Sequence, residues 1–136
     1  MLSPTAITVR LFLHVLAASV WVGGQIVLVG LVPTIRRSFP DATVAVARAY
    51  SRLAWPAFAI VVLTGIWNLI EVDVGNTTTT YQITVFVKIL LAIASGAAAA
   101  VHQVGRSRVA LALGGAIGFL TALGAMFVGY LLTTGR

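Results

Sequence analysis

Four long apolar stretches, separated by short polar segments, dominate the pattern of this chain. Lysine, arginine, aspartate and glutamate are absent from residues 11–35, 53–70, 89–105 and 109–135. A helix needs about 20 apolar residues to cross the hydrocarbon core of a bilayer, within a range of about 17–25. The pattern therefore predicts four membrane-spanning helices, at about 7–33, 53–71, 82–104 and 108–132. The second helix is expected to begin earlier, near Ala42, and to run into its span.

The charged residues between these stretches predict how the chain is oriented. Loops on the cytoplasmic side of a membrane are enriched in arginine and lysine. One side is basic and carries Arg36, Arg37, Arg48, Arg52, Arg106 and Arg108. The other side carries Arg10, Glu71, Asp73 and Arg136. We therefore expect a multi-pass protein of the inner (plasma) membrane. Residues 1–136 would form a single all-α domain, an antiparallel four-helix transmembrane bundle with both termini extracytoplasmic.

Composition agrees with a membrane protein and removes other classes. Hydrophobic residues make up 60% of the chain and charged residues 9%, against about 25% charged residues in soluble domains. The net charge of +6 does not predict a nucleic-acid partner, because the arginines lie at the span ends. The absence of cysteine excludes disulfides and thiolate metal ligands. The predicted partner is the lipid bilayer, with other membrane subunits or a second copy of the chain left open.

Several polar side chains lie inside the predicted spans, where they are costly and usually face other helices. His14 lies in the apolar segment "LHVLAASVWVGG", residues 13–24. Asn68 and Glu71 share a face near the outer end of the second span, and Lys88 lies near the outer end of the third. A rise of ~1.5 Å per residue puts these groups in one layer, roughly 10 Å below the outer surface. We therefore predict that the four side chains form one polar site.

Structural interpretations of the same residues remain open. Lys88 can extend to the outer interface, as long charged side chains do, and Glu71 can simply mark the end of its helix. His14 can be satisfied by a helix carbonyl. His102 lies about 20 Å from Lys88 along the helix axis, near the cytoplasmic boundary. We therefore predict that His102 is structural and shares no small ligand with His14.

Three segments of the chain resemble the copper-resistance D (CopD) family of membrane proteins. They are His14 with "WVGG" at 21–24, "YSRLAWPAFAIVVLTG" ending at residue 65, and Lys88 at the start of "KILLAI". The same histidine and lysine are similar to those of the related HemJ-type protoporphyrinogen oxidases, which are four-helix haem-binding proteins. The resemblance runs from the first to the third span, and the fourth adds little beyond hydrophobicity. It implies His14 as a ligand and Lys88 as its functional companion.

This resemblance makes haem b the leading cofactor hypothesis, with a redox or electron-transfer role. Haem needs an axial imidazole, an apolar slot and cations for its propionates. His14 would be the axial and metal ligand, and Arg10 and Lys88 would balance propionate or substrate charge. The slot would be shaped by Trp21, Gly23 and Gly24, and Asn68 would be a further polar member. No catalytic residue is assigned.

Two other functions remain open. The first is copper transport or resistance, which the family resemblance supports. Cu(I) prefers sulfur ligands, however, and the chain offers only Met1 and Met126. The second is a non-catalytic accessory subunit of a larger membrane complex. Small residues at 92, 96 and 100, and the GxxxG pair Gly114 and Gly118, would let helices approach closely. We predict that they pack helices of this chain against each other rather than against a second copy.

Overall fold

The computed structural model describes residues 3–135, which form four long α-helices and one short 3-10 helix, with no strand among them. The elements in chain order are α1 (Ala6–Ser38), α2 (Ala42–Val72), η1 (Val74–Asn76), α3 (Thr79–Val104) and α4 (Arg108–Thr134). All four α-helices are long and apolar enough to cross a membrane. The predicted all-α fold class with four spans is confirmed over this part of the chain. The expected start of the second helix at Ala42 is confirmed as well.

Helix starts follow from local side-chain caps. The hydroxyl of Thr5 accepts from the backbone N–H of Thr8 at 3.2 Å, and the hydroxyl of Thr8 accepts from the N–H of Thr5 at 3.3 Å. This reciprocal pair is a capping box, which satisfies backbone donors that a helix start leaves open. Ser107 caps α4 in a similar way, accepting from the N–H of Ala110 at 3.0 Å. At its other end α1 continues past Pro33 to Ser38, five residues beyond the predicted span.

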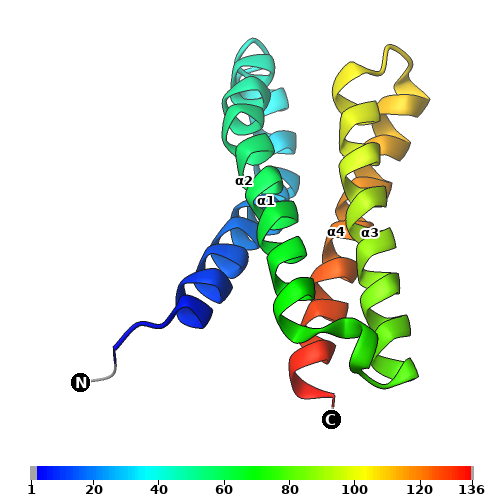
Figure 1. The fold of residues 1–136 in the computed structure, drawn as a ribbon. Coiled ribbons are helices and arrows are strands. Elements are labelled where there is room, and N and C mark those ends of the chain that lie inside the picture. The colour runs from blue at the N-terminus through cyan, green and yellow to red at the C-terminus, as the bar shows by residue number, and fades with distance from the viewer. Residues whose placement is uncertain (1–2, 136) are drawn as a thin grey trace. The chain divides into compact units, whose positions relative to one another are not determined.

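The described chain divides into two compact units at Val72 and Asp73. The first hairpin consists of α1 and α2, and the second consists of η1, α3 and α4. Figure 1 shows α1 (blue to cyan) joined to α2 (cyan to green) by a tight turn, and α3 (yellow-green) joined to α4 (orange to red) by another. The expectation that all four helices form one domain concerns how the hairpins associate, and it stays a prediction.

Small residues let the backbones of α3 and α4 approach each other closely in the second hairpin. A Cβ added at Gly114 would lie 2.8 Å from the backbone nitrogen of His102 and 2.9 Å from the carbonyl oxygen of Ala98. The hydroxyl of Ser95, which is 1% exposed, donates to the carbonyl of Gly118 at 3.0 Å. Any side chain at Gly114 would therefore force the helices apart. The prediction that the GxxxG pair packs helices of this chain is confirmed.

Most large apolar side chains of both hairpins point outward. Phe12, Leu63, Ile70 and Phe86 are examples with more than half of their surface exposed. Such exposure would be a liability in water, whereas in a bilayer these side chains contact lipid. The buried positions are mainly small residues, such as Ala17, Ala54 and Ala57. The fold is thus built for a lipid solvent, with polar groups kept between helices.

Candidate functional site

His14 is held by a threonine on the facing helix. Its Nδ1 atom lies 2.8 Å from the Oγ1 of Thr64, which is 6% exposed. The Thr64 hydroxyl donates its own proton back along α2, to the carbonyls of Ile60 at 2.6 Å and Val61 at 3.2 Å. A hydroxyl has a single proton, so Thr64 must accept from His14. The proton of the neutral imidazole therefore lies on Nδ1, and the ring lone pair lies on Nε2.

This arrangement is typical of a metal-ligating histidine. Such a histidine donates one ring N–H to a fixed acceptor, which orients the ring and makes the other nitrogen more basic. Gly65 follows Thr64 and leaves room for the imidazole, since a Cβ there would lie 3.6 Å from Cε1 of His14. Spacing puts Thr64 on the same face of α2 as Asn68, four residues later. Its contact with His14 was not predicted from the sequence.

A second polar cluster surrounds Arg10, one turn before His14 on α1. Arg10 is 6% exposed, and its Nη1 lies 3.6 Å from Oε2 of Glu71. The Nε1 of Trp67 donates to Oε1 of the same carboxylate at 3.2 Å. The guanidinium carbon also lies 5.9 Å from the centre of the Trp67 ring, within the range of a cation–π contact. Glu71 therefore does more than mark the end of its helix, because it neutralises a buried arginine.

Two polar atoms near this cluster are buried without a partner among residues 3–135. They are the Nε of Arg10 and the Oδ1 of Asn68. Buried polar groups normally have a hydrogen-bond partner, often an ordered water. Asn68 lies in the last turns of α2, which ends at Val72. Its participation in ligand binding stays a prediction.

The "WVGG" segment belongs to a separate aromatic cluster. Trp21 is 6% exposed and packs against Trp55 and Phe58, with ring centres 5.4 and 4.5 Å away. The hydroxyl of Tyr50 donates to the Trp21 carbonyl at 3.0 Å, and a Cβ at Gly24 would overlap the Tyr50 ring. The absence of a side chain at Gly24 therefore leaves the space that the Tyr50 ring occupies.

At the neighbouring Gly23, an added Cβ would meet no atom within 4 Å. Trp21 lies seven residues from His14, which is about 10 Å along the helix. The role of Trp21, Gly23 and Gly24 in shaping a cofactor slot stays a prediction.

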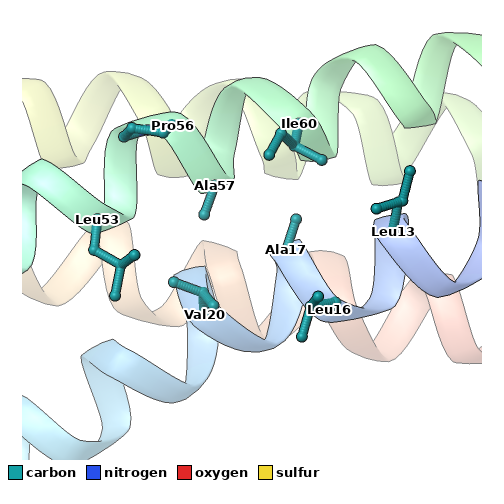
Figure 2. A pocket seen from close by; sticks show the side chains of 8 residues that line it. All are labelled: Leu13, Leu16, Ala17, Val20, Leu53, Pro56, Ala57 and Ile60. Atoms are coloured by element: carbon teal, nitrogen blue, oxygen red, sulfur yellow. The ribbon is translucent and has the colours of Figure 1, made fainter.

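An apolar hollow lies between α1 and α2, and it is lined neither by His14 nor by the aromatic cluster. Figure 2 shows it lined by Leu13, Leu16, Ala17 and Val20 of α1 and by Leu53, Pro56, Ala57 and Ile60 of α2. Ala17 and Ala57 point toward each other across it, and their small side chains leave the space open. Its volume is about 190 Å³, below the range of about 300–1,000 Å³ that is usual for ligand pockets. It has room for the edge of a flat ligand or a short alkyl chain.

The remaining candidates lie on the second hairpin. Lys88 is half-buried on α3 and its end lies against Gly129 of α4. Because Lys88 and His14 belong to different hairpins, their shared site stays a prediction. The Nδ1 of His102 donates to the carbonyl of Leu111 at 2.6 Å, tying α3 to α4. This bond supports the structural interpretation of His102.

The arrangement of acidic and imidazole groups limits what the described residues can hold. Nowhere in residues 3–135 do three or more histidine, aspartate or glutamate side chains gather as a potential metal cage.

The sequence profile described as Copper resistance protein D matches residues 44–134, about two thirds of the chain. The chain belongs to the copper-resistance protein D family. It is therefore a copper-resistance-type, multi-pass membrane protein. Searches of the curated proteins and of the solved structures gave no match.

The extent of the family match differs from the resemblance seen in the sequence. It covers α2, α3 and α4, and it begins after His14 and the "WVGG" segment. The expectation that the fourth span adds little to the resemblance was wrong, because the match runs through α4 to residue 134. Thr64, Asn68 and Lys88 lie inside the matched range.

Proposed function

We propose that this copper-resistance D family protein binds haem b through His14, in the outer half of the membrane, and has a redox or electron-transfer role. The observation that carries the proposal is the bond from Nδ1 of His14 to Thr64. It fixes the ring orientation and the tautomer, with the lone pair on Nε2. Metal-ligating histidines almost always show this arrangement.

The ligand set favours haem over a bare metal ion. The haem ring supplies four nitrogen ligands to its iron, so the protein needs to add only one or two axial groups. A single oriented imidazole meets that need. A copper ion would take several protein ligands, and Cu(I) would favour sulfur. The apolar hollow between α1 and α2 offers an apolar surface on the same hairpin as His14.

The two predicted cations contribute unequally to this proposal. Arg10 is already paired with Glu71, so its charge is largely balanced before any ligand binds. Lys88 belongs to the second hairpin, and its role as a second cation stays a prediction. When bound, haem would supply one-electron redox chemistry. The chain would orient the imidazole of His14 through the bond from its Nδ1 to Thr64. Its apolar helix faces would exclude water.

The chain has two histidines, which gives the experiment a matched control. Protein purified without a histidine tag from haem-replete cells should show a Soret band. His14→Gln should abolish this band while the protein still folds, and His102→Gln should retain it. Colourless wild-type protein, or equal bands in both variants, would contradict the proposal. A His14→Gln protein that lacks haem yet keeps full cellular activity would point to an accessory subunit instead.

Copper movement is the second candidate, and the family match favours it. With no cysteine in the chain, copper would have to use imidazole and oxygen donors, with His14 as the principal ligand. Expression of the wild-type protein should then change the copper content and copper tolerance of cells, and His14→Gln should remove the change. Equal copper content and tolerance with and without the protein would count against this function.

A further inference from the structure

The turn that joins α1 to α2 is flanked by four arginines. Arg36 and Arg37 lie in the last turn of α1, and Arg48 and Arg52 lie near the start of α2. All four are exposed. We call this end of the first hairpin the basic tip. Arginines at such a position orient a membrane protein, and the number and geometry of these four allow a second role.

Both helices of this hairpin are longer than a bilayer requires. α1 has 33 residues and α2 has 31, which at ~1.5 Å per residue gives about 50 and about 46 Å. The hydrocarbon core is about 30 Å thick, and even a tilt of about 40° would use only about 39 Å of helix. Charge-free sequence begins directly after Arg10 and ends directly before Glu71, so the core starts near this pair. The surplus turns therefore place the basic tip in the headgroup layer.

The two arginines of α2 point away from α1. The hydroxyl of Tyr50 donates to the carbonyl of Trp21 at 3.0 Å, so the Tyr50 side chain faces α1. Successive residues are about 100° apart around a helix, and positions two before and two after Tyr50 therefore lie about 160° from it. These positions are Arg48 and Arg52. They share the face of α2 opposite α1, one turn apart, where two like charges repel each other unless an anion lies between them.

The chain cannot supply the counter-charge for the basic tip. It has three acidic residues. Two of them, Glu71 and Asp73, lie at the opposite end of α2, roughly 30 Å from Arg52 along the helix axis. Asp41 in the turn is a single carboxylate against four arginines. Residues 74–136 contain no aspartate or glutamate, so the second hairpin brings no acidic side chain to the tip in any arrangement of the two hairpins.

We propose that the basic tip binds anionic phospholipid headgroups at the membrane surface. The planar guanidinium group donates to phosphate oxygens in a bidentate way, and clusters of four to eight basic residues beside a membrane span bind anionic lipids. Phe39 and Val44, which are 68% and 65% exposed at the tip, would enter the apolar edge of the same leaflet. The turn of the second hairpin carries two arginines, Arg106 and Arg108, and falls below this number. The proposal is independent of haem and of His14.

The tryptophans of the chain allow the lipid beside the first hairpin to be measured. All three, Trp21, Trp55 and Trp67, lie on α1 or α2, and Trp55 is about 4.5 Å along the axis from Arg52. The full chain is placed in nanodiscs of phosphatidylglycerol and phosphatidylcholine, with bromine on the acyl chains of one lipid or the other. Bromine quenches the fluorescence of a tryptophan that it contacts. Brominated phosphatidylglycerol should quench more strongly than brominated phosphatidylcholine at the same mole fraction, and equal quenching would overturn the proposal.

Two double variants with the same net charge give a matched comparison. Arg48→Gln/Arg52→Gln and Arg106→Gln/Arg108→Gln each remove two arginines from a turn region. The first should remove most of the excess quenching by phosphatidylglycerol, because each arginine near an anionic surface contributes a factor of about five to binding. The second should retain it. An equal loss in both variants would mean that net charge alone attracts the lipid, and would overturn the assignment to the basic tip.

Salt provides a test on the unaltered protein, should the first double variant lose its helical circular dichroism. Raising the salt concentration from about 0.1 to about 1 M shortens the Debye length from about 10 to about 3 Å. The excess quenching by phosphatidylglycerol should fall with it. Excess quenching that is unchanged at the higher concentration would show that the arginines do not attract the lipid through their charge, and would overturn the proposal.

Discussion

The guanidinium group of Arg10, almost completely buried, lies against the carboxylate of Glu71, with Nη1 and Oε2 3.6 Å apart. The Glu71 side chain is 52% exposed, so solvent screens part of the attraction. Removing its charge still leaves a buried arginine without a counter-ion. The pair therefore links the start of α1 to the end of α2, because a buried arginine without a counter-ion is costly.

Glu71→Gln should lower the stability of the protein by about 1–3 kcal/mol, between the values for exposed and buried pairs. Thermal unfolding in detergent micelles measures the effect. Asp73→Asn is the control, because Asp73 is bonded to Asn76 rather than to an arginine, and asparagine tolerates its positive φ of 49°. Equal unfolding temperatures for the two variants would show that the ion pair contributes nothing.

Gly24→Ala should destabilise the first hairpin, because the added methyl group overlaps the Tyr50 ring. Overpacking of this kind costs about 1–3 kcal/mol. Gly23→Ala is the matched control, since its Cβ would meet nothing within 4 Å. It should be neutral or slightly stabilising, as alanine is the better helix former. The comparison is made by thermal unfolding. An unchanged unfolding temperature for Gly24→Ala would show that the Tyr50 ring does not need the space at position 24.

Thr64→Val should weaken haem binding by about 10–100-fold, the usual cost of losing the group that orients a metal-ligating histidine. Valine keeps the shape of threonine and removes the acceptor for Nδ1 of His14. Thr84→Val serves as the control, because the hydroxyl of Thr84 bonds only the carbonyl of Thr80 on its own helix. Titration of both variants with haem gives the affinities. Unchanged affinity in Thr64→Val would separate haem binding from the His14 tautomer.

The orientation in the membrane is expected to place both termini outside, because the arginine-rich connections favour the cytoplasm. The chain lacks cysteine, so single cysteines report on position without background. In intact cells, an impermeant thiol reagent should label Asn76→Cys and leave Ser38→Cys unmodified. The reverse pattern would invert the predicted topology.

The helices were predictable from the charge-free stretches, which are long enough to span a bilayer. In lipid, such a stretch must form a helix so that its backbone N–H and C=O groups bond each other. The polar face of α2 was also visible from spacing. The pairing of His14 with Thr64 was not, because it depends on the register of the two helices, which the turn after Ser38 sets. The same register brings Tyr50 over Gly24. A histidine read by itself suggests a ligand, and only the facing helix reveals which ring nitrogen is held.

The bond between His14 and Thr64 also constrains how these two positions vary among related chains. Position 64 needs a short side chain that donates to its own helix and accepts from an imidazole. Serine and threonine meet both conditions with a single hydroxyl group. Related sequences with histidine at position 14 should therefore carry threonine or serine at position 64, and those that have lost the histidine should vary freely there. An alignment in which position 64 varies independently of position 14 would mean that the hydroxyl serves α2 alone.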